Sequence, residues 1–377
     1  MTRRGNNEGS IYRRTDGRWA AGVSLDGGRR KTYYGRTRQD VARKLQKAQR
    51  ALADGLPLAG DRLTTGALLE SWLQNVAAQK VRSKTLRRYR EIVHLHLAPE
   101  IGRVPLVKLA PQNVEAMLSA LLARGMSPRT ASHCRAVLRN ALHAAERWGF
   151  VGRNVAGLAE PPRVPQREVR PINTAQARAL LTAVKGDRLE ALFTVALAVG
   201  LRQSEALGLR WSDVDLDSAT LSVQRGLQRV DGLYVFLEPK TQRSRRTLTL
   251  PKPVVTALRE HRSRQAAERL LVGTAWQGEK WGHLVFANEA GEPLSGFHAS
   301  RRFHALLRLA GLPPMRYHDL RHGAASLMAA QGVPARVAME ILGHAEISTT
   351  LNIYTHVGSE LQKDAAERMA ASLWADA

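Results

Sequence analysis

A charged, proline-rich stretch without hydrophobic period lies near the middle of the chain, between Glu160 and Pro171. Proline lacks the backbone N–H that helices and central strands need, so this stretch is typical of an extended linker. One hydrophobic core cannot continue through such a linker, so the 377 residues are expected to form separately folded parts. We predict domains at residues 1–60, 61–160 and 172–377, with the linker at 161–171.

The first domain is predicted from its turn residues. Asp16-Gly17 and Asp26-Gly27-Gly28 separate three short runs between residues 10 and 35, and such residues supply the positive φ angles of tight hairpins. A basic helical stretch follows, from about Arg38 to Leu52. We expect a small α+β domain made of a three-stranded sheet and one helix. Its strands and turns carry Arg13, Arg14, Arg18, Arg29, Arg30 and Lys31.

The second domain is predicted to be an all-α helical bundle. Thr64, Ser83, Ala110-Pro111 and Ser127-Pro128 stand where helix starts are expected, and glycines follow three of the helical segments. Four amphipathic helices with short connections make a compact bundle. Two of them carry a cluster of basic residues, namely Lys84, Arg87, Arg88, Arg90, Arg129, Arg135 and Arg139.

The charge balance indicates a polyanionic partner. The formal net charge is +24, and three quarters of this excess lies before residue 166. Nucleic acid would relieve the self-repulsion of so basic a chain, whereas no apolar run reaches the roughly 18 residues of a membrane-spanning helix. For any single cation, an ordinary solvated surface is the alternative. The candidate DNA contacts are Arg13, Arg18, Arg30, Lys31, Lys84, Arg87, Arg88 and Arg135.

Several kinds of site are not expected. The single cysteine, Cys134, permits neither an internal disulfide nor a cysteine-based zinc site. His318 and His322 are four residues apart on a predicted helix, but no glutamate follows the first histidine as in zinc-binding helices. The sequence also has no glycine-rich nucleotide-binding loop, so we expect no metal and no other cofactor. Without a recognisable secretory signal, a cytoplasmic location is expected.

The third domain is predicted to be a mainly helical α+β domain. Gly200 ends one apolar helix and Arg202 opens the next, with Glu205 three residues later on the same face. That spacing usually gives an exposed ion pair, but the apolar flanks favour a partly buried guanidinium with a fixed anion. Helical patterns cover 174–185 and 189–199, strand patterns cover 219–225, 233–237 and 246–250, and helices return to the end.

Other candidate residues lie in the second half of this domain. Lys240 is predicted at the tip of a hairpin between the strands at 233–237 and 246–250, where a solvated lysine is the ordinary alternative. His318 and Arg321 share one face of a helix. Gly343 breaks the chain between two helices, which lets His344 and Tyr354 converge, although Tyr354 alone would suit a core aromatic residue.

Together these side chains suit metal-free phosphoryl transfer. A phosphodiester under attack gains negative charge on its non-bridging oxygens, and without a metal that charge needs fixed cationic donors. Arg202 and Arg321 can supply them, and His344 can donate to a non-bridging oxygen. Tyr354 is the candidate nucleophile, assisted by His318. Lys240 is the candidate general acid for the departing 5′ oxygen.

At these positions the sequence resembles the tyrosine recombinase (phage integrase) family. The resemblance rests on G-L-R-Q-S-E-A-L-G-L-R-W around Arg202, P-K-T-x-x-S-x-R at Lys240, H-D-L-R-H at His318 and Arg321, and L-G-H-x9-Y from His344 to Tyr354. It implies that these six residues are catalytic, with Glu205 supporting them. The first two domains resemble the arm-type and core-binding DNA domains of integrases by layout alone.

The resemblance implies strand exchange on duplex DNA at core and arm attachment sites. Four protomers would act together, each forming a 3′-phosphotyrosine and then rejoining the strand to its partner, without ATP. Residues 358–377 resemble the C-terminal tail that joins protomers of a homotetramer, and a directionality factor and a DNA-bending protein are the accessory partners implied. Two alternatives remain open: a type IB topoisomerase, which shares this chemistry, and a catalytically silent DNA-binding regulator.

Overall fold

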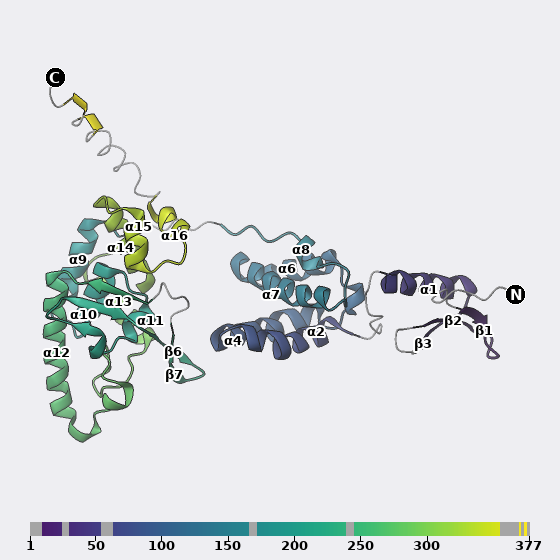
Figure 1. Cartoon of the computed structure of the whole chain (residues 1–377), viewed down its shortest axis with the longest axis horizontal. Coiled ribbons are helices and arrows are strands. Elements are labelled where there is room, and N and C mark those ends of the chain that lie inside the picture. The colour runs from purple at the N-terminus through teal and green to yellow at the C-terminus, as the bar shows by residue number, and fades with distance from the viewer. Residues whose placement is uncertain are drawn as a thin grey trace. The chain divides into compact units, whose positions relative to one another are not determined.

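The structure is a computed structural model of the whole chain. It describes residues 10–24, 30–53, 63–165, 172–238, 245–354, 369–370 and 373–374, except for a few side chains near the end of the first helix. The chain divides into two compact units, Met1–Arg167 and Glu168–Ala377 (Figure 1), and each is treated by itself.

The first unit begins with an antiparallel sheet in the order β1-β2-β3. Gly17, at φ +79°, lies in the turn between β1 and β2, as the Asp-Gly pair predicts. Ala21 and Val23 of β2 are buried against Val41, Leu45 and Ala48 of the helix that follows, so the core of this part is small. The elements are β1 (Ser10–Arg13), β2 (Trp19–Ser24), β3 (Arg30–Gly35) and α1 (Arg38–Ala53).

The same unit continues as a helical bundle whose apolar stripes form one buried cluster. Thr64 and Ser127 each accept a hydrogen bond from the backbone three residues on and so cap α2 and α7. Ser83 is not a cap, because Arg82 takes that position and Ser83 is already helical. The elements are α2 (Thr65–Trp72), η1 (Leu73–Ala77), α3 (Ala78–Lys80), α4 (Ser83–Ile92), η2 (Val93–Leu97), α5 (Ala98–Ile101), η3 (Leu106–Lys108), α6 (Pro111–Ala123), α7 (Pro128–Arg147) and α8 (Val155–Leu158).

The second unit is built around α10, whose residues are mostly buried. It packs against α12 and α14, and Figure 1 shows α12 along one side of the unit. The helices are α9 (Thr174–Val184), α10 (Glu190–Val199), α11 (Gln203–Leu207), η4 (Trp211–Asp213), α12 (Lys252–Val272), η6 (Gly273–Ala275), η7 (Glu279–Trp281), α13 (Gly296–Leu309), α14 (Tyr317–Ala330), α15 (Ala335–Leu342) and α16 (Ile347–Tyr354).

The strands of this unit correct one prediction. The hairpin expected between 233–237 and 246–250 is wrong, because those two strands belong to different sheets. Asp231 and Gly232 both have positive φ, as a two-residue hairpin turn requires, and they join β7 to β6 instead. The strands are β4 (Val214–Asp215), β5 (Thr220–Val223), β6 (Gly226–Val230), β7 (Leu233–Leu237) and β8 (Arg246–Thr249), in sheets ordered β4-β5-β8 and β6-β7.

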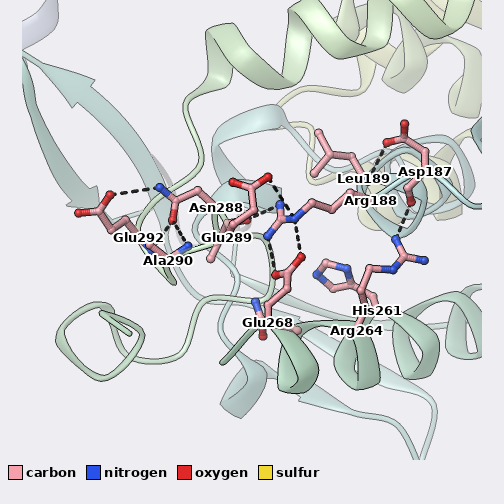
Figure 2. Close-up of polar contacts among 12 residues, drawn as sticks. Asp187, Arg188, Leu189, His261, Arg264, Glu268, Asn288, Glu289, Ala290 and Glu292 are labelled. Atoms are coloured by element: carbon pink, nitrogen blue, oxygen red, sulfur yellow. Dashed lines mark hydrogen bonds and ion pairs between the residues drawn. The ribbon is translucent and has the colours of Figure 1, made fainter. Parts of the chain in front are cut away.

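Ion pairs fasten the segment between α9 and α10 onto α12 (Figure 2). Arg188 binds Glu268 of α12 through two hydrogen bonds of 2.7 and 2.8 Å and donates a third, of 2.9 Å, to the carbonyl of Ala287. Arg264 of α12 donates to the carbonyl of Asp187 at 2.7 Å. Forked arginines of this kind fix both the position and the direction of their partners. None of the described helices combines the length and the apolar composition that spanning a membrane requires.

Candidate active site

Arg202 lies where α10 and α11 meet. Gly200 ends α10 at φ +65°, and the chain then turns so that Arg202 stands at the N-cap of α11. Glu205 accepts from the backbone N–H of Arg202 at 3.1 Å and from its Nη1 at 2.6 Å. The side chain of Arg202 is 35% exposed and that of Glu205 is 8% exposed, so this is a partly buried pair rather than an ordinary surface one.

Arg321 of α14 is buried and bonded to the backbone on two sides. Its Nη1 donates to the carbonyl of Gly200 at 2.7 Å, and its Nη2 donates to the carbonyl of Leu342 at the end of α15. Burial, together with the charge of Arg202, lowers the pKa of Arg321 to about 9. The guanidinium therefore still carries its charge at neutral pH.

Arg246, the first residue of β8, is part of the same cluster, although no role was predicted for it. Its side chain is 7% exposed; Nε donates to the carbonyl of Ile341 at 2.7 Å and Nη2 to Oε2 of Glu205 at 3.1 Å. Burial would raise the pKa of Glu205, but the charges of Arg246 and Arg202 outweigh it and hold that pKa below its usual range. The only sequence signal for Arg246 is that it occupies the last position of the P-K-T-x-x-S-x-R motif.

The three guanidiniums converge on the C-terminal end of α15. Its last carbonyls lack partners inside the helix and carry partial negative charge. Arg246 binds Ile341, Arg321 binds Leu342, and Arg202 donates to the carbonyl of Gly343 at 2.9 Å. Three successive carbonyls thus hold three cations directly before the predicted site residue His344.

His344 follows this helix end with its side chain buried. Its Nδ1 is 2.8 Å from the hydroxyl of Thr350, and the residue is 8% exposed. Burial, with the charges of Arg321 and Arg202, lowers the pKa of His344 to about 4, so the ring is neutral at pH 7. If Thr350 donates to Nδ1, then Nε2 carries the proton and can donate a hydrogen bond to a phosphate oxygen.

His318 lies one turn before Arg321 on α14 and is exposed. Its ring makes an edge-on contact with that of His322, with 5.1 Å between centroids. Although the side chain reaches solvent, desolvation by the protein around it and the neighbouring His322 lower the pKa of His318, which favours a neutral ring able to accept a proton. Among the described residues, no group of three histidine, cysteine or acidic side chains could hold a metal ion.

The remaining two predicted catalytic residues are not seen in the cluster. Tyr354 lies on α16, and its hydroxyl donates to the carbonyl of Val333 at 3.0 Å, while partial burial raises its pKa. Lys240 lies outside the described residues. The structure thus brings together Arg202, Glu205, Arg321 and His344, with His318 on the same helix as Arg321.

The predicted DNA contacts are distributed over the first unit. Arg13 and Arg18 lie at the β1–β2 turn, Arg30 donates to the hydroxyl of Ser10, and Lys31 lies over the ring of Tyr33. These cations stand on two adjacent hairpins of one small sheet.

In the bundle, the predicted contacts Lys84, Arg87 and Arg88 lie on α4, and both arginines pair with Glu91. Arg88 also lines a hollow of about 520 Å³ with Arg129 and His133 of α7. Arg135 differs, because it donates to the carbonyls of Ala159 and Gly157 at 2.8 and 3.2 Å. Its guanidinium therefore serves the fold of the bundle, a role that the charge pattern did not predict.

Sequence comparison connects both units to one group of proteins. Residues 166–360 match the phage integrase family, and residues 64–122 match the phage integrase N-terminal SAM-like domain. An integrase of Streptomyces ambofaciens is 30% identical over an alignment of 355 positions, and the match covers 89% of each chain. An integrase of Saccharopolyspora erythraea is 27% identical over a gapped alignment of 433 positions, which covers 99% of this chain and 98% of the other.

Solved structures show the same fold. The Tn1549 transposon integrase in complex with a circular intermediate DNA has a TM-score of 0.70 at 20% identity, covering 82% of this chain and 100% of that one. The lambda integrase tetramer bound to a Holliday junction has a TM-score of 0.56 at 19% identity, covering 89% and 95%.

Proposed function

The chain belongs to the phage integrase family of tyrosine recombinases, and from that premise we propose how its residues cut and rejoin duplex DNA. It is a site-specific recombinase, an enzyme that breaks and reseals DNA strands. The comparisons give no support to a topoisomerase or to a silent DNA-binding regulator. What is proposed below is the assignment of individual residues, domains and partners.

The observation that carries the assignment is the cluster of Arg202 and Arg321 at the end of α15. Each guanidinium has five N–H donors and uses only some of them on Glu205 and on backbone carbonyls. The remaining donors, together with Nε2 of His344, would bind the non-bridging oxygens of the scissile phosphate. Because they are already fixed by the fold, they stabilise the charge that develops there without further reorganisation.

The covalent step uses Tyr354 and transfers two protons. The Tyr354 hydroxyl must first leave the Val333 carbonyl, and it then attacks phosphorus with loss of its proton to the neutral imidazole of His318. A bond forms between phosphorus and the tyrosine oxygen, the bond to the 5′ oxygen breaks, and Lys240 protonates that oxygen. The phosphotyrosine keeps the energy of the broken bond, so the reverse reaction reseals a strand without ATP.

The domains and partners are proposed from layout and family. Residues 1–60 would bind arm sites, residues 61–160 would bind the core site, and residues 172–377 would catalyse. A homotetramer joined through the C-terminal tail is supported by the tetrameric lambda structure and by exposed apolar side chains at Met369, Leu373 and Trp374. A directionality factor and a DNA-bending protein would assist, and the protein would act in the cytoplasm, where its DNA lies.

Replacing Tyr354 by phenylalanine tests the assignment. On a nicked core site that traps the intermediate, the wild-type protein should form a covalent protein–DNA adduct, whereas Tyr354→Phe should form none. The hydroxyl is the only group removed, so binding in a gel-shift assay should persist with an unchanged dissociation constant. An adduct formed by the variant would show that another residue is the nucleophile.

A further inference from the structure

We propose that Arg246 is a positioning residue that sets the direction of the Arg202 guanidinium in the active site. The proposal rests on the proposed function, since it takes Arg202 to be a phosphate ligand. Arg246 is not itself assigned to the phosphate, because its Nε and Nη2 are bonded to the carbonyl of Ile341 and to Glu205, and its Nη1 lies against Gly343. It would act through the two groups that it shares with Arg202, the carboxylate of Glu205 and the end of α15.

The carboxylate of Glu205 is divided between the two arginines. Oε1 accepts from Nη1 of Arg202 at 2.6 Å, while Oε2 accepts from Nη2 of Arg246 at 3.1 Å and from the backbone N–H of Arg202. A carboxylate and a guanidinium left to themselves prefer a two-bond, fork-to-fork pairing. By occupying Oε2, Arg246 limits the Arg202 side chain to a single bond with Glu205, which leaves other N–H groups of Arg202 for the phosphate.

The end of α15 forms the second connection. Arg246 holds the carbonyl of Ile341, and Arg202 holds that of Gly343 two residues later. A Cβ atom at Gly343 would lie 2.8 Å from Nη1 of Arg246, so the guanidinium packs directly against the residue whose carbonyl Arg202 uses. Arg246 therefore contacts both anchors of Arg202, which are the carboxylate of Glu205 and the end of α15 at Gly343.

Loss of the fork at Arg246 should release both anchors. Oε2 of Glu205 and the carbonyl of Ile341 would each lose a donor, and Glu205 would be free to rotate into a two-bond pairing with Arg202. The Arg202 guanidinium would then turn toward Glu205 and away from the phosphate. Misplacement of a catalytic group by about 1 Å can cost on the order of 100-fold in rate.

The test compares two core sites, one with a normal scissile phosphate and one with a methylphosphonate there. The methyl group replaces a charged non-bridging oxygen, so that site needs less help from Arg202. Arg246→Lys keeps the charge and loses the fork. We expect it to form the covalent adduct on the order of 100-fold more slowly on the normal phosphate, with a much smaller deficit on the methylphosphonate. Arg202→Lys should show the same substrate dependence.

Arg188→Lys is the matched control, because it also removes an arginine fork, here a partly buried one, from the same unit, but at Glu268 of α12 (Figure 2). It should lower the melting temperature without slowing the cleavage of either core site. The ratio of the two cleavage rates is taken on one preparation and does not depend on the fraction folded. It therefore reports on Arg202 even if Arg246→Lys is less stable.

A second measurement uses Glu205→Gln. If Arg246 acts through the carboxylate of Glu205, the two substitutions disturb the same interaction. Arg246→Lys should then reduce the rate of adduct formation much less in a Glu205→Gln protein than in the wild-type protein. The proposal is overturned if Arg246→Lys cleaves at the wild-type rate, if its deficit is equal on both substrates, or if the two substitutions are additive. Failure of the proposed function would be seen separately, as an adduct formed by Tyr354→Phe.

Discussion

At the scale of single residues, the site is governed by how its charges are divided among shared partners. Arg202, Arg246 and Arg321 lie together although like charges repel, because Glu205 and the carbonyl end of α15 lie between them. Burial, together with these positive neighbours, lowers the pKa of His344 and keeps its ring neutral. Because the ring of His344 does not titrate near pH 7, its ability to donate a hydrogen bond does not change with pH in that range.

The lowered pKa of His344 makes stability depend on pH. Its pKa of about 4 in the folded protein is below the ordinary value of 6.5, so between these values the unfolded chain binds a proton that the folded protein does not. This contribution to stability is complete above pH 6.5 and is lost as the pH falls toward 4. The melting temperature of the wild-type protein should therefore fall over this range, and that of His344→Gln should fall less.

The comparison isolates His344 from other titrating groups. His261, His318 and His322 also have lowered pKa values, but they are present in both proteins, so their contribution cancels in the difference. Melting curves at pH 7.5 and pH 5 are sufficient. An equal fall in melting temperature in the two proteins would show that His344 is not the buried, neutral group described above.

At the scale of elements, the sequence predicted the ends of helices and strands better than it predicted which strands pair. Gly200, Ser127 and the Asp16-Gly17 turn each mark an element end that the structure confirms, because capping and turn chemistry act over a few residues. The partners of β7 and β8 were predicted wrongly, because β6 was not expected as a separate strand and because β5 pairs with β8 across the whole β6–β7 segment.

The site was predicted unevenly for the same reason. The convergence of Arg202, Arg321 and His344 followed from motifs, whereas Arg246 was missed. Its contacts with Glu205 and Ile341 span 41 and 95 residues of sequence. Spacing along a helix or strand cannot report contacts of that range, and a strand arginine carries no sign that it is buried.

Two glycines with similar backbone angles allow a test of the α10 end. Gly200 and Gly232 both have positive φ, but a Cβ atom at Gly200 would lie 2.5 Å from a methyl of Leu342. In the described part of the chain, a Cβ atom at Gly232 would have no atom within 4 Å beyond its chain neighbours. Both alanine substitutions should cost about 1 to 2 kcal/mol in backbone strain. Gly200→Ala should cost clearly more in a denaturant titration and should also slow cleavage, because it displaces Leu342, which binds Arg321. Equal losses of stability would contradict the close packing of α10 on α15.

At the scale of the whole molecule, the net charge is distributed unevenly between the two units. Of the net charge of +24, only a quarter belongs to residues 166–377, and several arginines there form partly buried or buried pairs, such as Arg188 with Glu268 and Arg246 with Glu205. The first 165 residues carry the remainder, which includes the exposed side chains of Arg13 and Arg30 in the sheet and of Lys84, Arg87 and Arg90 on α4. Electrostatic attraction to DNA should therefore come mainly from the first unit.

Deleting residues 1–60 tests whether this segment binds arm-type DNA separately from the residues that bind and cleave the core site. This segment carries a net charge of +9 and has its own small core, so its loss should weaken binding to arm-type DNA strongly and leave cleavage of the core site nearly unchanged. The slope of log affinity against log salt should also become shallower on DNA that contains both sites, because fewer phosphates are neutralised. Removal of the charge alone, by Arg13→Gln with Arg18→Gln, should act in the same direction. An equal loss of arm binding and core cleavage would show that residues 1–60 have no separate binding role.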